Sequence, residues 1–237
     1  MFTLLKTISH LPFFKSINYG YITNTPFLSY CHVKFEVINY EDILFSDFGI
    51  PFDPKLDTAL VCRRAEYLAS RYAAKLLLEH SECFFNVKSS STREPIWPKG
   101  WCGSISHTHN NAIVIVTSES NGILPGIDIE LFDSSVMLET ADFFTTERER
   151  ELLLATSISY TLGLLIIFSA KESLFKSLYP KVRHIFYFDT AEILQIDIIE
   201  KKFTLVLVKN ISEKIKTGTK FEGCYFFQDD KIITIIT

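Results

Sequence analysis

The stretch Gly126-Ile127-Asp128-Ile129-Glu130 alternates apolar and acidic residues. Side chains of a β-strand point alternately to its two faces, so Asp128 and Glu130 share one face. Downstream, residues 164–179 contain neither Gly nor Pro and continue an apolar run, which predicts a long helix. Glu172 and Lys176 lie one turn apart on that helix and share a face. A strand and a helix therefore offer three carboxylates and a lysine, which favours a metal site.

The acidic strand taken alone also fits a simpler interpretation, a solvated strand face, because short acidic pairs arise by chance in a chain of this length. A comparable stretch, residues 195–200, has Asp197 and Glu200 three positions apart, on opposite faces of a strand. We interpret that second stretch as structural. The stretch at residues 126–130 differs because its Asp128 and Glu130 can combine with Glu172 of the predicted helix.

Three motifs stand in a fixed order along the chain. Arg-Glu-Pro-Ile-Trp-Pro-Lys-Gly (93–100) and Gly-Ser-Ile-Ser-His (103–107) precede the acidic strand, and Phe-Ser-Ala-Lys-Glu-Ser (168–173) follows it. In this order they resemble the 4′-phosphopantetheinyl transferases, most closely the siderophore-synthetase-activating branch of the enterobactin synthase component D type. Two further segments add to the resemblance, the arginine-rich residues 63–75 and Phe-Phe-Thr-Thr-Glu at residues 143–147.

The resemblance implies an α+β fold of two pseudo-symmetric α/β halves, each a long helix packed on an antiparallel sheet, with the site between the halves. We assign residues 1–120 to the N-terminal half, with the coenzyme A phosphate contacts, and residues 121–237 to the C-terminal half, with the metal and catalytic residues. Residue patterns predict a capping box at Thr146 and Glu149. They also predict helices at 60–79 and from about 162 to Pro180, and strands at 31–37, 112–116, 185–189, 192–198, 203–209, 220–228 and 231–236.

The implied activity is that of a holo-carrier-protein synthase. Such an enzyme transfers the 4′-phosphopantetheine moiety of coenzyme A to a serine of an apo acyl or peptidyl carrier protein and releases 3′,5′-ADP. The carrier would serve siderophore or other nonribosomal peptide, polyketide or fatty acid biosynthesis. Two alternatives stay open, a non-catalytic carrier-protein or nucleotide-binding module and another Mg²⁺-dependent phosphotransferase. Intact Glu172 and Lys176 argue against the first, and the lack of a G-x-x-x-x-G-K-S/T loop argues against the second.

The resemblance also implies roles for individual residues. Asp128, Glu130 and Glu172 are the expected ligands of Mg²⁺, a hard cation that prefers oxygen. Glu172 is also the expected general base for the acceptor serine, because a hydroxyl is a poor nucleophile until its proton is removed. Lys176 is expected to stabilise charge on the pyrophosphate or to protonate the leaving group.

Coenzyme A itself is the expected ligand of basic and small residues: Arg63, Arg71, Arg93, Ser106, His107 and Lys176. The Arg63-Arg64 doublet leaves the helical register open, and all the basic residues of segment 63–75 also fit the wet face of an amphipathic helix. Arg93 alone also fits a solvated loop arginine. His107 with His109 and Cys102 matches no closed zinc site.

Composition and net charge limit the classes of protein to which the chain can belong. The chain has 237 residues, of which 47% are hydrophobic, and a net charge of -4, which argues against binding nucleic acid through phosphates. Its five scattered cysteines fit a reducing compartment, so we expect the protein in the cytoplasm. The first residues make a poor signal peptide and the longest apolar run is too short to span a membrane, and we expect a monomer. A basic surface for an acidic carrier is expected at the end of the long helix, formed by Lys171, Lys176, Lys181 and Arg183.

Overall fold

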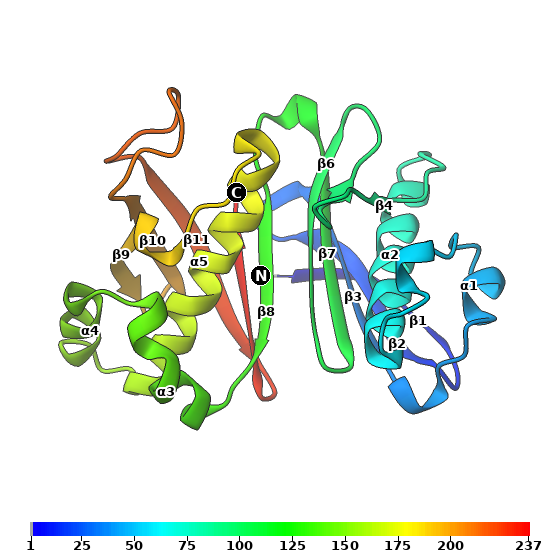
Figure 1. The fold of residues 1–237 in the computed structure, drawn as a ribbon, viewed down its shortest axis with the longest axis horizontal. Helices are drawn as coiled ribbons and strands as arrows, with labels where there is room; N and C mark the ends of the chain where they lie inside the picture. The colour runs from blue at the N-terminus through cyan, green and yellow to red at the C-terminus, as the bar shows by residue number, and fades with distance from the viewer. Residues whose placement is uncertain (1) are drawn as a thin grey trace. The chain divides into compact units, whose positions relative to one another are not determined.

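A five-stranded antiparallel sheet with one long helix packed on it occurs twice in the chain (Figure 1). The structure, a computed structural model, describes residues 2–237. By its internal contacts the chain divides into two units, Met1–Pro125 (unit 1) and Gly126–Thr237 (unit 2). The predicted α+β class with two helix-on-sheet halves is therefore confirmed.

The sheet of unit 1 has the strand order β1-β2-β3-β7-β6. Its strands are β1 (Phe2–His10), β2 (Phe14–Ile22), β3 (Thr25–Phe35), β6 (Trp101–Thr108) and β7 (Asn111–Ser118). The remaining elements of the unit are η1 (Val37–Asn39), α1 (Leu44–Asp47), η2 (Pro54–Leu56), α2 (Val61–His80), the short pair β4 (Lys88–Ser89) and β5 (Pro95–Ile96), and η3 (Glu119–Asn121).

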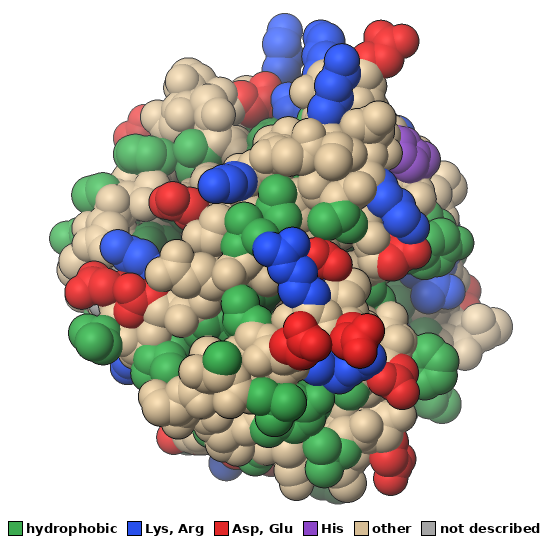
Figure 2. All heavy atoms as spheres, turned by 90° about the vertical axis from the view of Figure 1, so that its left-hand side faces the viewer, with side chains coloured by type: hydrophobic (Ala, Val, Ile, Leu, Met, Phe, Trp, Pro, Cys, Tyr) green, Lys and Arg blue, Asp and Glu red, His purple; other side chains and the backbone are tan. Residues whose placement is uncertain are grey.

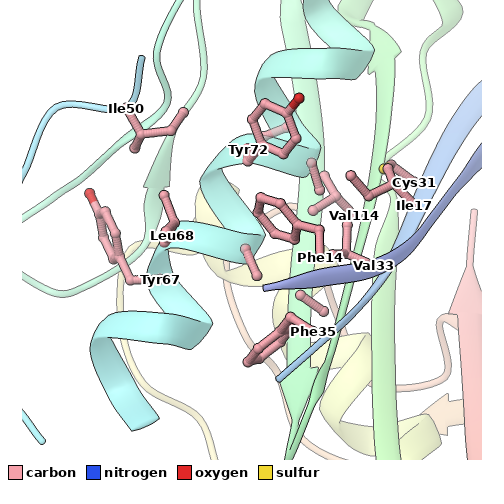
Figure 3. Close-up of a cluster of buried hydrophobic side chains, with 14 of the residues drawn as sticks. Phe14, Ile17, Cys31, Val33, Phe35, Ile50, Tyr67, Leu68, Tyr72 and Val114 are labelled. Carbon is pink, nitrogen blue, oxygen red and sulfur yellow. The ribbon is translucent and has the colours of Figure 1, made fainter. Parts of the chain in front are cut away.

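Helix α2 packs on this sheet with the apolar face that its sequence predicts. Leu68 and Tyr72 are buried there, and Tyr72 stacks on Phe14 of β2 with ring centroids 5.0 Å apart (Figure 3). The helix begins and ends one residue later than predicted, at Val61 and His80 instead of residues 60 and 79. Arg71, which the simplest interpretation places on the wet face, is instead buried among the core residues.

The sheet of unit 2 has the order β8-β12-β11-β10-β9. Its strands are β8 (Gly126–Leu131), β9 (Ala191–Asp197), β10 (Lys202–Leu207), β11 (Lys220–Gln228) and β12 (Lys231–Ile236). The helices are α3 (Ser134–Phe144), α4 (Glu147–Leu154), α5 (Tyr160–Val182) and η4 (Phe188–Thr190).

In both units the strand that precedes the long helix pairs with the last strand of the unit. These pairs are β3 with β7 in unit 1 and β8 with β12 in unit 2. In unit 1 the sheet continues beyond β3 with β2 and β1 and beyond β7 with β6, whereas in unit 2 it continues only beyond β12, with β11, β10 and β9. The two halves therefore share a helix-on-sheet pairing but not a full strand order.

Helix α5 lies very close to β8 at Gly126. A Cβ atom at this position would be 2.0 Å from the carbonyl oxygen of Ser173, so only glycine permits the contact. Ile127 and Ile129 are fully buried, and Asp128 between them is buried as well. The acidic strand is therefore not a solvated strand face.

Two predictions about the end of α5 are wrong. The helix does not stop at Pro180 but continues to Val182, because a proline in the last turn removes a single backbone hydrogen bond. It ends where Arg183 adopts a left-handed conformation and donates its N–H to the carbonyl of Tyr179 at 2.9 Å. Residues 185–189 form no strand; instead Phe186 packs on Phe175 of α5 and Phe188 packs on Phe168 of the same helix.

The capping box of α4 is confirmed, with Glu149 N donating to Thr146 Oγ1 and Thr146 N donating to Glu149 Oε2. Asp197 is structural, since its carboxylate accepts from the backbone N–H groups of Ile199 and Glu200. Within residues 2–237 no helix is both long and apolar enough to cross a membrane.

Candidate active site

Three carboxylates and a lysine come together where α5 packs on β8. Lys176 Nζ donates to Asp128 Oδ1 at 2.5 Å, and Ser169 Oγ donates to Asp128 Oδ2 at 2.7 Å. Glu130 interacts electrostatically with Asp128, Lys176 and Glu172. Residues two apart on the strand and four apart on the helix thus come within electrostatic reach of one another.

The charges of this cluster shift its pKa values. Burial and repulsion by Asp128 raise the pKa of Glu130 to about 8, although Lys176 opposes the shift. Burial also raises the pKa of Glu172, against the attraction of Lys176. Burial lowers the pKa of Lys176, but attraction by the carboxylates, Asp128 foremost, outweighs it and leaves the pKa raised. When all three carboxylates are ionised, the cluster carries more negative charge than one lysine neutralises.

This donor set fits a divalent cation. Carboxylate oxygens are the ligands of a hard ion such as Mg²⁺, and the raised pKa of Glu130 marks a place where added positive charge is favourable. In residues 2–237 no three His, Cys, Asp or Glu side chains form a ready-made metal site. Instead, the ammonium of Lys176 occupies the position beside Asp128 Oδ1.

A small apolar cavity opens beside Glu172. It has a volume of about 160 Å³ and is lined by Glu172, Leu174, Phe175 and three consecutive aromatic residues at 186–188. Phe175 and Phe186 pack with ring centroids 5.0 Å apart on one side of it. The cavity can accept an uncharged group next to the carboxylate.

Two serines of the Phe-Ser-Ala-Lys-Glu-Ser motif fasten the helix to the sheet. Ser169 binds Asp128 and lies 2.9 Å from Thr234 Oγ1 of β12, while Ser173 Oγ donates to the Thr234 carbonyl at 3.0 Å. Both serines are fully buried. Sequence patterns did not predict this role, although the two serines stand four residues apart and share a face of the helix.

Lys171 is not part of a basic surface, contrary to expectation. Its ammonium is buried and lies 2.8 Å from Glu149 Oε2 and from the Phe144 carbonyl. Glu149 also accepts from the backbone N–H of Ile193 at 2.8 Å. The carboxylate that binds Lys171 and the start of β9 is therefore that of Glu149, whereas Glu147 is exposed.

The expected basic surface loses Lys176 as well, because that side chain binds Asp128, whereas Lys181 and Arg183 are exposed. On the face that Figure 2 shows, Lys and Arg side chains gather at the upper end and are elsewhere interspersed with acidic and apolar ones.

In unit 1 the expected coenzyme A residues lie in separate groups. Arg71 stacks on the Tyr67 ring, 4.5 Å from its centroid, and donates from Nη2 to Ser89 Oγ at 2.7 Å. Its buried Nε has no hydrogen-bond partner among the described residues, and burial lowers its pKa. No acid forms a salt bridge with this guanidinium in the described part of the chain.

Arg63 and His107 form the second group. Arg63 Nη1 lies 2.5 Å from His107 Nε2, and both side chains contact Glu66. Arg64 points elsewhere, to Asp42 at 2.8 Å and to the Asp57 carbonyl at 2.7 Å. The sequence leaves open which arginine of the doublet faces the site. In the structure Arg63 contacts His107, and Arg64 does not.

The other two expected residues flank these groups. Ser106 is buried on β6, next to His107. Arg93 is exposed in the turn between β4 and β5, with a left-handed backbone (φ 71°) and its N–H donated to the Ser90 carbonyl at 3.2 Å.

Comparisons with known proteins identify the family of the chain. A family model described as the 4′-phosphopantetheinyl transferase N-terminal domain matches residues 53–117, and one described as the 4′-phosphopantetheinyl transferase superfamily matches residues 125–235. Enterobactin synthase component D of Escherichia coli O157:H7 is 32% identical over 160 residues, 65% of this chain and 74% of that protein.

Two more relatives extend the comparison. Enterobactin synthase component D of Salmonella typhi is 29% identical over 168 residues, 69% of this chain and 70% of that protein. The 4′-phosphopantetheinyl transferase Npt of Nocardia iowensis is 29% identical over 132 residues, 55% of this chain and 59% of that protein. With both family models matched in order, the chain belongs to the 4′-phosphopantetheinyl transferase superfamily, in the branch of enterobactin synthase component D.

Proposed function

We propose that the protein transfers the 4′-phosphopantetheine moiety of coenzyme A to a serine of an apo carrier protein and releases 3′,5′-ADP. The observation that carries the proposal is the junction of β8 and α5, where Lys176 and three carboxylates lie together in a chain that matches both family models. A non-catalytic module of this family has no need for such a costly cluster of like charges around a fully buried Asp128.

Asp128, Glu130 and Glu172 are the residues that would hold Mg²⁺. When bound there, the ion would neutralise the pyrophosphate of coenzyme A and fix its position. The excess of negative charge in the cluster, seen in the raised pKa of Glu130, supports this assignment.

For coenzyme A we propose Arg71 and Arg63 as the principal phosphate ligands, with Arg93, Ser106 and His107 beside them. The support for Arg71 is its buried guanidinium, which has no acidic partner and one unpaired donor among the described residues. Burying a charge without a partner is costly, so such a group is suited to an anionic ligand. The apolar cavity beside Glu172 would take the uncharged pantetheine arm.

In the transfer step the serine oxygen attacks the phosphorus attached to pantetheine. A new P–O bond forms, and the P–O bond to 3′,5′-ADP breaks. Glu172 accepts the serine proton, for which its raised pKa makes it a better base than an ordinary carboxylate. Lys176 stabilises the negative charge on the pyrophosphate or donates a proton to the departing 3′,5′-ADP.

The partner is proposed to be an acyl or peptidyl carrier domain. The names of the relatives favour one that serves siderophore biosynthesis. The monomeric state, the cytoplasmic location and the lack of nucleic-acid binding stay predictions from the sequence.

The function is tested by incubating the purified protein with coenzyme A, Mg²⁺ and several apo carrier domains and measuring their intact mass. The proposal expects a mass gain of one phosphopantetheine on the acceptor serine, none on a Ser→Ala carrier, and none in excess EDTA. Coenzyme A binding without transfer to any carrier would favour the non-catalytic module, and phosphoryl transfer without pantetheine would favour another phosphotransferase.

A further inference from the structure

Glu66, an acid with no role in the function proposed above, binds both Arg63 and His107. Its Oε2 lies 3.3 Å from His107 Nδ1 and 3.4 Å from Arg63 Nη1. Arg63 Nη1 is in turn 2.5 Å from His107 Nε2. Arg63 and Glu66 face each other one turn apart on α2, and His107 reaches them from β6.

These contacts define the tautomer of His107. A guanidinium has only N–H donors, so His107 Nε2 must accept from Arg63 through its lone pair. The ring proton of the neutral imidazole then sits on Nδ1, which faces the Glu66 carboxylate, an acceptor. The Glu66 carboxylate thus accepts from Nδ1–H of His107 on one side and from Nη1–H of Arg63 on the other.

The surroundings of Glu66 keep its carboxylate directed at these partners. Its side chain is 18% exposed, against 43% for Arg63 and 30% for His107. Burial raises the pKa of Glu66, while the charge and hydrogen bond of Arg63 oppose the shift and His109 adds a weaker attraction. The acid is the most buried member of the group and Arg63 is the most open to a ligand.

We propose that Glu66 is a positioning residue for coenzyme A. It holds His107 with the proton on Nδ1 and so keeps Nε2 as the acceptor that orients Arg63, whose other N–H groups bind a phosphate of coenzyme A. This inference rests on the proposed function, because it takes a coenzyme A phosphate as the ligand of Arg63.

The test uses Glu66→Leu and Glu66→Gln, with Glu79→Leu as the control. Glu79 lies on the same helix and pairs only loosely with Lys75, at 3.8 Å. Two properties are measured: the tautomer of His107 by ¹⁵N NMR of the imidazole, and coenzyme A affinity by calorimetry alongside kcat for transfer.

We expect Glu66→Leu to weaken coenzyme A binding about tenfold or more, the usual effect of one lost hydrogen bond to a charged group. Its kcat should stay within about twofold, and His107 should lose its Nδ1–H signal. The amide oxygen of Glu66→Gln still accepts from Nδ1–H, so this variant should keep the tautomer and lose less affinity. Glu79→Leu should match the parent in both measurements.

The role of Glu66 is overturned if the parent binds coenzyme A and Glu66→Leu binds it equally well. It is also overturned if His107 of the parent carries its proton on Nε2, a result that needs no activity. A folded parent that binds no coenzyme A overturns the proposed function itself, and with it the ligand named here.

Discussion

Lys176 holds a fully buried Asp128, its ammonium 2.5 Å from Oδ1 of the carboxylate. Among the described residues, this ammonium is the cation that opposes the mutual repulsion of Asp128, Glu130 and Glu172. A divalent ion on the same carboxylates would take over that task. Lys176 would then be available to an anion such as the pyrophosphate of coenzyme A.

Replacing Lys176 by Met should therefore lower both stability and turnover. Asp128 loses a charged hydrogen-bond partner, which costs about 1.5 to 3 kcal/mol in the free energy of unfolding of the metal-free protein. Added Mg²⁺ should restore most of this loss, while kcat stays at least about tenfold below that of the parent. Denaturant unfolding with and without Mg²⁺ measures the first effect. Lys181→Met, an exposed position on the same helix, is the control.

The metal-free protein should lose stability as the pH rises. The pKa of Glu130 is raised to about 8 in the folded protein, above the value of about 4.3 of an unfolded glutamate. The folded state thus binds more protons between these values, and the free energy of unfolding falls with rising pH across that window. Glu130→Gln should flatten this dependence, as should saturating Mg²⁺. Identical pH profiles for the parent and Glu130→Gln would contradict the account.

Arg71→Met should separate binding from stability. We expect it to weaken coenzyme A binding by about 10- to 100-fold, because a buried cation that meets the phosphate is lost. The ligand-free protein should be no less stable, since the substitution removes a buried charge that has no acidic partner. Arg64→Met, on the same helix but bound to Asp42, should keep the parent affinity. Calorimetry and thermal unfolding distinguish the two effects.

The sequence predicts the two elements of the charge cluster because strand and helix periodicity define which side chains share a face. The acidic pair of β8 and the Glu172-Lys176 pair of α5 are of this kind. Periodicity does not identify partners on other elements. The burial of Arg71 against Ser89 and the pairing of Lys171 with Glu149 therefore could not be predicted. The aromatic stretch at residues 186–188 resembles a strand in sequence, but its rings pack on α5, a contact that periodicity does not reveal.

Lys171 and Glu149 should behave as a buried pair. Lys171→Met leaves a fully buried carboxylate without its cation and should cost about 3 to 5 kcal/mol. Glu149→Leu should cost a similar amount, whereas the double variant should cost less than the sum. Denaturant unfolding of the four proteins provides this double-mutant cycle. Additive losses would show that the two side chains stabilise unit 2 independently.

Glu172→Gln tests the central claim, that Glu172 is both the general base and a metal ligand. The amide keeps the shape of the side chain but loses its charge and its ability to accept a proton. The decisive measurement is single-turnover transfer from coenzyme A to an apo carrier at saturating Mg²⁺. We predict a rate at least about 10²-fold below that of the parent, with metal-free coenzyme A binding unchanged. A rate within a few-fold of the parent would contradict the claim and leave Asp128 and Glu130 as the carboxylates of the mechanism.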